Sequence, residues 1–497
     1  MKQLDTTLFG KPGYLKITEY LADSQKKDLG WCLPLGLFER LHFFMMRMFL
    51  KFSWFSDRLY ILHPCNESPR YTALLNFFKK RGLYDMCVER SMAYPGIHSF
   101  YLAKNVLFND KPNYINAQGV ADTAEVALSK ALGEMFERMI TGLWDQNKNI
   151  YNASVTELRQ KKVALYYPPD WHDFLPKQKA KFPELQHRPD DQVRWVVGKS
   201  LTTGEKVFLP RQVTSWFEGN RNSKKIFLNS TTNGSAAYFT YDGALVRGLL
   251  EVVQRDGFFV HWLTKTVPKV IDQASLPMDL REKVARFASL GVAITILDIT
   301  SLNIPCVCIV AETRSARVPS VAVSAAADTT YQAAIAEALR EMIGGIEPFY
   351  RAHLVPLEDL TKIDIFSLNK ITRQTYWRGD QALTNIQWFT SGEVAGLDTL
   401  ERGTGSTAEI NDTAKLAAVI KILQEFGHGY EPIVYEPIHP LTKEVGMYVV
   451  QTYIPKAFPL YLHEKYGTFA SPRLGDFHFT KKGVRNFTLN TEPHMFS

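Results

Sequence analysis

The sequence predicts an α/β (α+β) fold, in which a body of mixed sheets and helices follows a helical extension. From about residue 98 onward, apolar segments of strand length, such as HSFYLAKNVLF, alternate with helical segments rich in Ala and Leu. The chain has 497 residues, which is too many for one small core. We therefore expect residues 1–97 to form an aromatic-rich helical extension and residues 98–497 to form the main domain.

The composition is that of an ordinary globular protein and excludes several classes of function. Apolar residues make up 45% of the chain and charged residues 22%. The net charge of +7 is scattered in short clusters, which predicts no nucleic-acid partner. The five cysteines show neither zinc-site spacing nor an even count. Cys306 and Cys308 alternate within IPCVCIV, which predicts two packed thiols on one strand face.

Neither a signal peptide nor a transmembrane segment is predicted. The stretch MKQLDTTLFGK has no apolar region of the signal-peptide kind, so we expect a cytoplasmic protein. Residues 37–55 are strongly apolar but include four charged residues, which is too many for a membrane span. We interpret this stretch as an amphipathic helix packed on its own protein. Docking on a membrane surface or on a partner is the alternative.

Three long helices are predicted in the main domain, and each follows a loop. They cover residues 122–144, residues 242–262 and a third segment that begins at Asp328 and Thr329. Asp or Thr at the start of each segment can accept a backbone hydrogen bond and cap the helix. Each helix is thus expected to start at a polar loop, which places loop and helix side chains close together.

Several apolar segments are predicted to be strands. VRWVVGKSLTTGEKVFLP is typical of a hairpin that turns at TTGE. GVAITILDIT and IPCVCIVAET are apolar enough for buried strands. Later in the chain, PIVYEPIHP and MYVVQTYIP repeat this paired pattern, which suggests an internal duplication of the mixed-sheet body.

The three helices carry related charged faces. Charged or amide side chains recur at positions i, i+3 and i+4: Glu134, Glu137 and Arg138 in ALGEMFER, Glu251, Gln254 and Arg255 in GLLEVVQR, and Glu337, Arg340 and Glu341 in the third helix. This spacing places each set on one helix face. Such a set is usually a solvated, salt-bridged face worth a few tenths of a kcal/mol. These sets, however, lie in otherwise apolar helices, where a charge needs a partner.

Carboxylates that converge from several helices predict a cation between them. Mg²⁺ takes oxygen ligands and shares its shell with phosphate oxygens, and arginines nearby would hold those phosphates. The loop Ser230–Gly234 adds hydroxyl, amide and backbone N–H groups at the entry of the second helix, where anions bind well. The pattern therefore predicts a Mg-nucleotide site built from three helices, without a Walker A or Rossmann glycine motif.

Three motifs, in this order and spacing, resemble the YcaO family. They are ALGEMFER, NGSAAYFTYDGALVRGLLEVVQRDGF and ADTTYQAAIAEALREM, and the similarity covers roughly residues 98–497. The resemblance implies a YcaO-like fold, ATP and Mg²⁺ as cofactors, and activation of a backbone amide in a precursor peptide. In azoline-forming members, a Cys, Ser or Thr side chain attacks the preceding carbonyl, ATP phosphorylates the resulting oxygen, and phosphate leaves. Other members make thioamides or amidines.

Carried onto this chain, the resemblance implies specific site residues. The Mg²⁺ ligands would be Glu134, Glu137, Glu251, Gln254 and Glu341. The nucleotide contacts would be Ser230, Asn233, Arg255 and Arg138. The two similar helices would then face the same metal-bound triphosphate, and no catalytic residue is assigned.

The chain departs from the family pattern at three places. Gln254 replaces the usual Glu, which makes one ligand neutral, and Glu337 stands where Arg is common. The terminal TEPHMFS resembles a proline-rich tail that many cyclodehydratases insert into the active site, with only Pro493 in place. These departures leave open an active enzyme and a YcaO-like scaffold that binds nucleotide, peptide or a partner enzyme. Structural ion-pair helices in an unrelated protein are the third alternative.

The expected partners follow from the resemblance alone. They are a precursor peptide and a separate peptide-binding protein, and the family also allows a homodimer. Residues 1–97 would serve as a docking segment or as an added packing layer. His261, in FFVHW, invites assignment as a base, but a hydrogen-bonded histidine at a helix end is the commoner arrangement.

Overall fold

The computed structural model describes most of the chain from residue 62 onward. The described residues are 62–64, 69–90, 94, 96–108, 111–216, 225–313, 320–346, 366, 368, 373, 376–402 and 411–496. The amphipathic helix predicted at residues 37–55 lies outside them. The chain divides into two compact units: unit 1 is Met1–Met139, Ser315–Val318 and Ile343–Glu358, and unit 2 is Ile140–Arg314, Pro319–Met342 and Asp359–Ser497.

Unit 1 contains an antiparallel sheet with the strand order β1-β2-β3-β4. Its elements are β1 (Leu62–Pro64), α3 (Pro69–Lys80), β2 (Met86–Arg90), β3 (His98–Phe108), β4 (Lys111–Ala121) and α4 (Ala124–Met139). Strands β3 and β4 pair along their whole length, and α4 packs against both. A Cβ at Gly119 would lie 1.9 Å from the carbonyl oxygen of Ala127, so only glycine allows α4 to approach β4 this closely.

The region before residue 98 is less helical than the sequence indicates. In its described part, α3 is a helix, whereas β1 and β2 are strands. Strand β2 also pairs with β3, across the predicted boundary between residues 97 and 98. Short apolar segments such as MCVER fit a strand or a helix equally well by pattern, and pairing with β3 decides between them.

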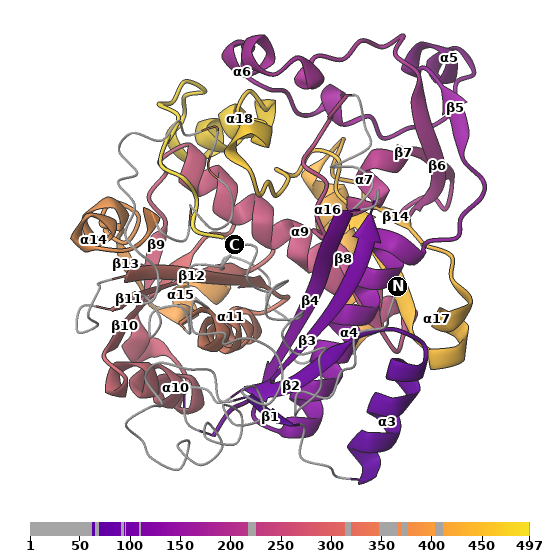
Figure 1. The fold of residues 1–497 in the computed structure, drawn as a ribbon. Coiled ribbons are helices and arrows are strands. Elements are labelled where there is room, and N and C mark those ends of the chain that lie inside the picture. The colour runs from indigo at the N-terminus through magenta and orange to yellow at the C-terminus, as the bar shows by residue number, and fades with distance from the viewer. Residues whose placement is uncertain are drawn as a thin grey trace. The chain divides into compact units, whose positions relative to one another are not determined.

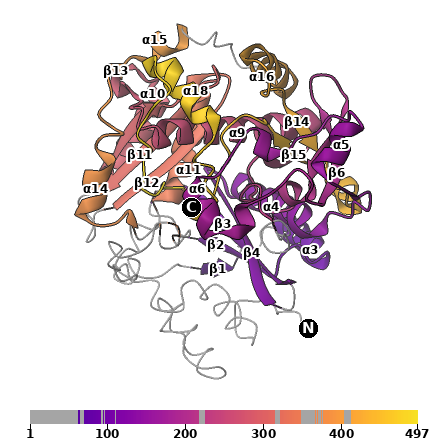
Figure 2. The ribbon, with the colours of Figure 1, turned by 90° about the horizontal axis from the view of Figure 1, so that it is seen from above.

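Unit 2 is built from two sheets and the long helix α9 (Tyr241–Leu263). One sheet has the order β12-β11-β10-β9-β13, and the other has the order β5-β6-β14-β15-β8, with β7 paired to β6. Helix α9 contacts β8 and β15 of the second sheet and β11 and β12 of the first. Figures 1 and 2 show the two sheets on either side of this helix.

The strands of unit 2 are β5 (Tyr151–Ala153), β6 (Val193–Ser200), β7 (Lys206–Pro210), β8 (Ser235–Tyr238), β9 (Lys269–Ile271), β10 (Val292–Asp298), β11 (Cys306–Thr313), β12 (Ser320–Ala327), β13 (Val394–Ala395), β14 (Ile433–Tyr435) and β15 (Tyr448–Tyr453). The hairpin predicted at TTGE is β6–β7. Strands β10 and β11 form the antiparallel pair expected from their apolar sequences. Cys306 and Cys308 are fully buried as predicted, and burial raises the pKa of both thiols.

Further helices and helical turns precede, connect or follow these strands. They are η2 (Ile140–Trp144), α5 (Val155–Gln160), η3 (Pro168–Asp170), α6 (Pro176–Lys181), η4 (Pro183–Leu185), α7 (Arg211–Thr214), η5 (Gln273–Ser275), α10 (Met278–Ser289), α11 (Tyr331–Gly345), α14 (Asp380–Ile386), α15 (Leu397–Arg402), α16 (Asp412–Phe426), α17 (Pro440–Val445), η9 (Glu464–Tyr466) and α18 (Pro472–Lys482). The α/β fold class predicted from the sequence is confirmed.

Helix α9 fits between two sheets because it is apolar on nearly all sides and carries glycines where backbones meet. Thr240 caps it by accepting a hydrogen bond from the backbone N–H of Gly243. A Cβ at Gly248 would lie 2.6 Å from the carbonyl oxygen of Gly234, and one at Gly257 would lie 2.6 Å from that of Ile299. The helix therefore approaches a loop at each of two places more closely than an alanine would allow.

The three helices begin close to the predicted residues, but the residue that caps the third helix differs from the prediction. The hydroxyl of Thr123 accepts from the backbone N–H of Val126 (3.4 Å), and α4 then continues directly into the π-helical turn η2. The third helix is α11, and its capping hydroxyl belongs to Thr330, which accepts from Ala333. Neither Asp328 nor Thr329, the two predicted caps, therefore caps α11, and Asp328 instead forms an ion pair with Lys415 at 2.7 Å. It lies too far before the first helical turn to reach its free N–H groups.

Candidate functional site

The charged face of α4 is held by strand β4 within unit 1. Glu134 accepts a hydrogen bond from the backbone N–H of Gln118 (2.7 Å) and forms an ion pair with Arg138 (2.6 Å). Arg138 also donates to the side-chain oxygen of Asn116 at 3.0 Å. Glu137 is half-buried on the same helix. The face is thus fixed by the sheet, in contrast to an ordinary solvated helix surface.

The matching face of α9, in unit 2, is built in the same way. Glu251 accepts a hydrogen bond from the backbone N–H of Gly234 (3.0 Å) and pairs with Arg255 at 3.5 Å. In both helices, the first carboxylate of the motif therefore holds a backbone N–H and pairs with the arginine four residues later. Gln254 is 6% exposed, and no described residue forms a hydrogen bond with its Nε2.

The loop Ser230–Gly234 is positioned by its glycine. Gly234 has a φ of 80°, and a Cβ there would lie 2.2 Å from the carbonyl oxygen of Thr452. The chain then enters β8, and α9 begins only at Tyr241. The prediction that this loop forms an anion site at a helix N-terminus is therefore wrong. The loop instead faces Glu251, in the third turn of α9, through the Gly234 N–H.

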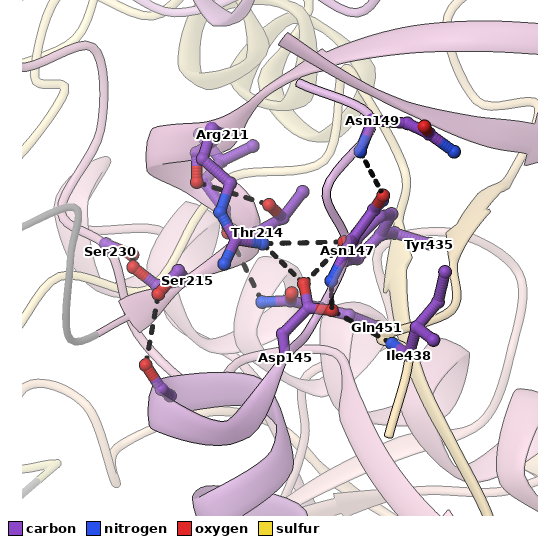
Figure 3. A network of polar contacts seen from close by, with 12 residues as sticks. Asp145, Asn147, Asn149, Arg211, Thr214, Ser215, Ser230, Tyr435, Ile438 and Gln451 are labelled. Atoms are coloured by element: carbon purple, nitrogen blue, oxygen red, sulfur yellow. Dashed lines mark hydrogen bonds and ion pairs between the residues drawn. The ribbon is translucent and has the colours of Figure 1, made fainter. Parts of the chain in front are cut away.

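Ser230 is 4% exposed and turns its hydroxyl toward α7. The hydroxyl oxygen lies 2.9 Å from the carbonyl oxygen of Gln212 and 3.1 Å from that of Ser215, as Figure 3 shows in part. A hydroxyl has one hydrogen to donate, and here a backbone carbonyl receives it. Toward a cofactor, Ser230 can therefore act as an acceptor and not as a donor.

A small cavity with a mixed polar and apolar lining adjoins this loop. Its lining includes Ser230, Asn233, Val252 and Gln451, and its volume is about 50 Å³. The side-chain carbonyl oxygens of Asn233 and Gln451 are both buried, and neither has a hydrogen-bond partner among the described residues. Buried polar atoms are normally paired, so these two leave room for a donor that no described residue provides.

Buried polar atoms without a hydrogen-bond partner indicate whether this region could bind a polar cofactor. Besides Asn233 Oδ1, the buried Nε2 of Gln254 and Nε of Arg255 have no hydrogen-bond partner in the part of the chain that the structure describes. An acceptor, an amide donor and a guanidinium donor thus belong to residues that follow Glu251 on α9 or precede its partner Gly234. This donor set suits a metal-bound phosphate chain, which brings acceptor oxygens together with water donors.

The third helix contributes two of the predicted residues in a different setting. Glu337 pairs with Arg340 on α11 at 2.5 Å, and Glu341 is exposed. Ser230, Asn233, Glu251, Gln254, Arg255 and Glu341 belong to unit 2, whereas Glu134, Glu137 and Arg138 belong to unit 1. Within the described parts of the chain, no three His, Cys, Asp or Glu side chains form a ready metal-binding cluster. The Mg²⁺ ligand set stays a prediction.

The last described residues lie against Arg255. The Phe496 ring stands 4.4 Å from the Arg255 guanidinium carbon. Trp377 donates to the carbonyl oxygen of Pro493 (3.0 Å), and Arg373 donates to that of Phe496 (2.8 Å). Burial, together with the charges of Arg373 and Arg255, lowers the pKa of His494. The segment that resembles the family's tail is therefore packed beside a predicted phosphate-binding residue.

Two groups near this site have structural roles. His261 donates from Nδ1 to the carbonyl oxygen of Gly257 (2.8 Å), and burial lowers its pKa to about 3, so it is not assigned as a base. Asp256 follows Arg255 and forms a buried bidentate pair with Arg473, at 2.9 and 2.6 Å. Sequence reasoning missed Asp256, although a charge in an apolar helix is the signal that it applied to Glu251.

Comparison with known proteins decides the family. A family model, described as a YcaO cyclodehydratase that binds ATP and Mg²⁺, matches residues 118–457, more than half of the chain. The chain belongs to the YcaO family. This description agrees with the cofactors predicted from the sequence, ATP and Mg²⁺. A search of curated protein sequences gives no match to this YcaO chain.

Solved structures share the YcaO fold at low sequence identity. A heterocyclase in complex with substrate and cofactor has a TM-score of 0.65 and 17% identity, covering 84% of this chain and 55% of its own. The heterocyclase TruD has a TM-score of 0.55 and 18% identity, covering 74% and 50%. YcaO from Methanopyrus kandleri, bound with AMPPCP and Mg²⁺, has 0.55 and 18%, covering 80% and 91%. The chain spans about half the length of the two heterocyclases.

Among the described residues, no helix is both long enough and apolar enough to cross a membrane.

Proposed function

We propose that the chain uses ATP and Mg²⁺ to activate backbone amides of a precursor peptide. Cyclodehydration of Cys, Ser or Thr to azolines is the reaction that fits the family best. The observation that carries the proposal is the candidate site at α9, where Glu251 is held by the Gly234 N–H and three nearby residues, Asn233, Gln254 and Arg255, have a buried polar atom without a described partner. An unrelated structural ion-pair helix would not need such unpaired groups around its carboxylate.

The residues of unit 2 suggest how this half of the site works. Bound ATP and Mg²⁺ supply the phosphoryl group that turns the amide oxygen into a leaving group. Glu251 offers carboxylate oxygens to the metal, and its orientation is fixed by Gly234 and Arg255. Arg255 offers its unpaired N–H to phosphate oxygens, and Ser230 offers an oxygen lone pair. Gln254 contributes no charge, so this half carries one negative charge fewer than its relatives.

A scaffold that binds nucleotide without turnover is the second candidate. Two observations favour it. The Nε2 of Gln254 is buried and unpaired where the family has a carboxylate, and Glu337 is neutralised by Arg340 on its own helix. Under this alternative the chain would bind Mg-ATP and a peptide or partner enzyme, and phosphate release would not respond to peptide.

We propose a separate peptide-binding protein as the partner. The heterocyclases with similar structures are about twice as long as the aligned part of this chain. Under this proposal a second protein docks the precursor peptide, as the family resemblance implies. The precursor peptide is the substrate under this proposal, and a homodimer stays an untested option.

The test is calorimetric titration with Mg-ATP, followed by phosphate release with and without a candidate precursor peptide. Glu251→Ala should abolish binding. Glu425→Ala is the matched control, because Glu425 is 66% exposed on α16 and pairs only loosely with Lys421 at 3.8 Å. Peptide-stimulated phosphate release supports the enzyme, and binding without release supports the scaffold. Equal binding by both variants would contradict the assignment of Glu251.

A further inference from the structure

A buried carboxylate lies directly after η2 and gathers donors from three segments of unit 2. The Asp145 side chain is 1% exposed. It accepts hydrogen bonds from Arg211 Nη1 (2.5 Å), the Tyr435 hydroxyl (2.5 Å), and the backbone N–H groups of Asn147 (3.0 Å) and Ile438 (2.9 Å). Figure 3 shows these contacts converging on one carboxylate. Four donors match the roughly four lone-pair positions of a carboxylate, so the group is saturated.

The element that Asp145 holds is the short helix α7. Arg211 is its first residue, and all four of its residues are buried. A single helical turn has almost no stability of its own, because nucleation is costly. Its position must therefore come from tertiary contacts. Among the contacts described for α7, the ion pair between Arg211 and Asp145 is the one between two charged side chains.

On its other side, α7 fixes the approach to Ser230. The Gln212 side chain donates to the carbonyl oxygen of Lys225 (2.6 Å) and accepts from the backbone N–H of Phe227 (2.8 Å). The Ser230 hydroxyl then donates to the carbonyl oxygen of Gln212 or of Ser215. The chain entering the candidate site is thus tied to α7 at three places in six residues.

Helix α7 also forms part of the cavity wall. Val213 and Ser230 both line the cavity. The carbonyl oxygen of Val213 accepts from Gln451 Nε2 (3.3 Å) and from the Tyr453 hydroxyl (3.1 Å), both on β15. The unpaired Oε1 of Gln451 belongs to the same amide group. A shift of α7 would therefore move Ser230 and reorient Gln451 together.

We propose that Asp145 and Tyr435 are positioning residues for the cofactor-binding loop. They hold α7 through Arg211, and α7 in turn orients the oxygen of Ser230 toward the bound nucleotide and metal. The inference rests on the proposed function, because it takes Ser230 as a cofactor contact. Asp145 and Tyr435 do not touch the cofactor under this assignment and act only through α7.

Hydrogen exchange of the nucleotide-free protein tests the mechanical link by itself. In Tyr435→Phe, which removes one donor from Asp145, amides in residues 225–231 should exchange about tenfold faster. Tyr241→Phe is the matched control, because its hydroxyl also donates to a carboxylate, that of Glu436, at 2.8 Å. Unchanged exchange in Tyr435→Phe, or an equal change in both variants, would overturn the inference.

Mg-ATP affinity tests the consequence for the site. Tyr435→Phe should weaken binding about tenfold, and in a Ser230→Ala background the same change should cost less than about threefold. Equal losses in both backgrounds would mean that Tyr435 does not act through Ser230. Asp145→Asn is the second variant and should show the same dependence on Ser230. If the unmodified chain binds no Mg-ATP, the proposed function fails, whereas the exchange experiment still decides whether the network positions the loop.

Discussion

Replacing Asp256 by Ala should destabilise unit 2 by about 3–5 kcal/mol, because it leaves a buried guanidinium without its counter-ion. Asp256 is fully buried and Arg473 is 2% exposed. The carboxylate also accepts from the Ser301 hydroxyl (2.7 Å) and from the backbone N–H of Phe458 (2.7 Å). All these donors lose their acceptor at once. The expected loss is a large share of a typical stability of about 5–15 kcal/mol.

The assay is urea unfolding followed by circular dichroism, with the free energy of unfolding extrapolated to water. Asp170→Ala is the control, because its pair with Arg159 at 2.6 Å is 38–48% exposed and should contribute less than about 1 kcal/mol. Adding Arg473→Met to Asp256→Ala should restore part of the loss by removing the orphaned charge. If Asp256→Ala changes the free energy of unfolding no more than Asp170→Ala does, the reasoning about the buried pair is wrong.

Three further predictions follow from other contacts. Burial lowers the pKa of His172 to about 4 from a usual 6.5, so its contribution to stability is present above pH 6.5 and is lost as the pH falls toward 4. In His172→Gln, the melting temperature should therefore depend less on pH over this range, and an unchanged pH dependence would refute the prediction. Gly248→Ala should lower the melting temperature, because its Cβ would meet the Gly234 carbonyl at 2.6 Å; a melt within 1 °C of the parent chain would contradict this close approach. Gln254→Glu adds a carboxylate beside Glu251, so the melting temperature of this variant should fall without Mg²⁺ and recover with Mg-ATP. A melting temperature that does not change on addition of Mg-ATP would argue against a metal at this position.

Sequence patterns predicted α9 almost to the residue. Residues 242–262 were expected, and the helix spans Tyr241–Leu263. Its signals are local, since the cap at Thr240 and the apolar sequence lie within one segment. The similar charged faces of α4 and α9 were also expected, because i, i+3 and i+4 spacing needs no knowledge of the fold.

Contacts between distant segments could not be predicted in this way. Arg473 lies 217 residues after Asp256, and no pattern in either segment names the other. The same holds for Asp145 and Tyr435, which are 290 residues apart. The loop before α9 illustrates the limit, since a short strand intervenes and the Gly234 N–H binds the Glu251 carboxylate, so it is not free for an anionic ligand. Strand pairing, which decided β1 and β2, is likewise non-local.

The placement of α9 between two sheets has a consequence for how unit 2 comes apart. The same helix contacts β8 and β15 on one side and β11 and β12 on the other. If α9 separates from one sheet, it therefore also exposes the apolar face of the other. The two sheets should therefore melt as one cooperative block, and the slowest-exchanging amides of β11 and β15 should open with the same free energy. A ligand held by α9 would then protect strands on both sides of the helix, including those far from any atom it touches.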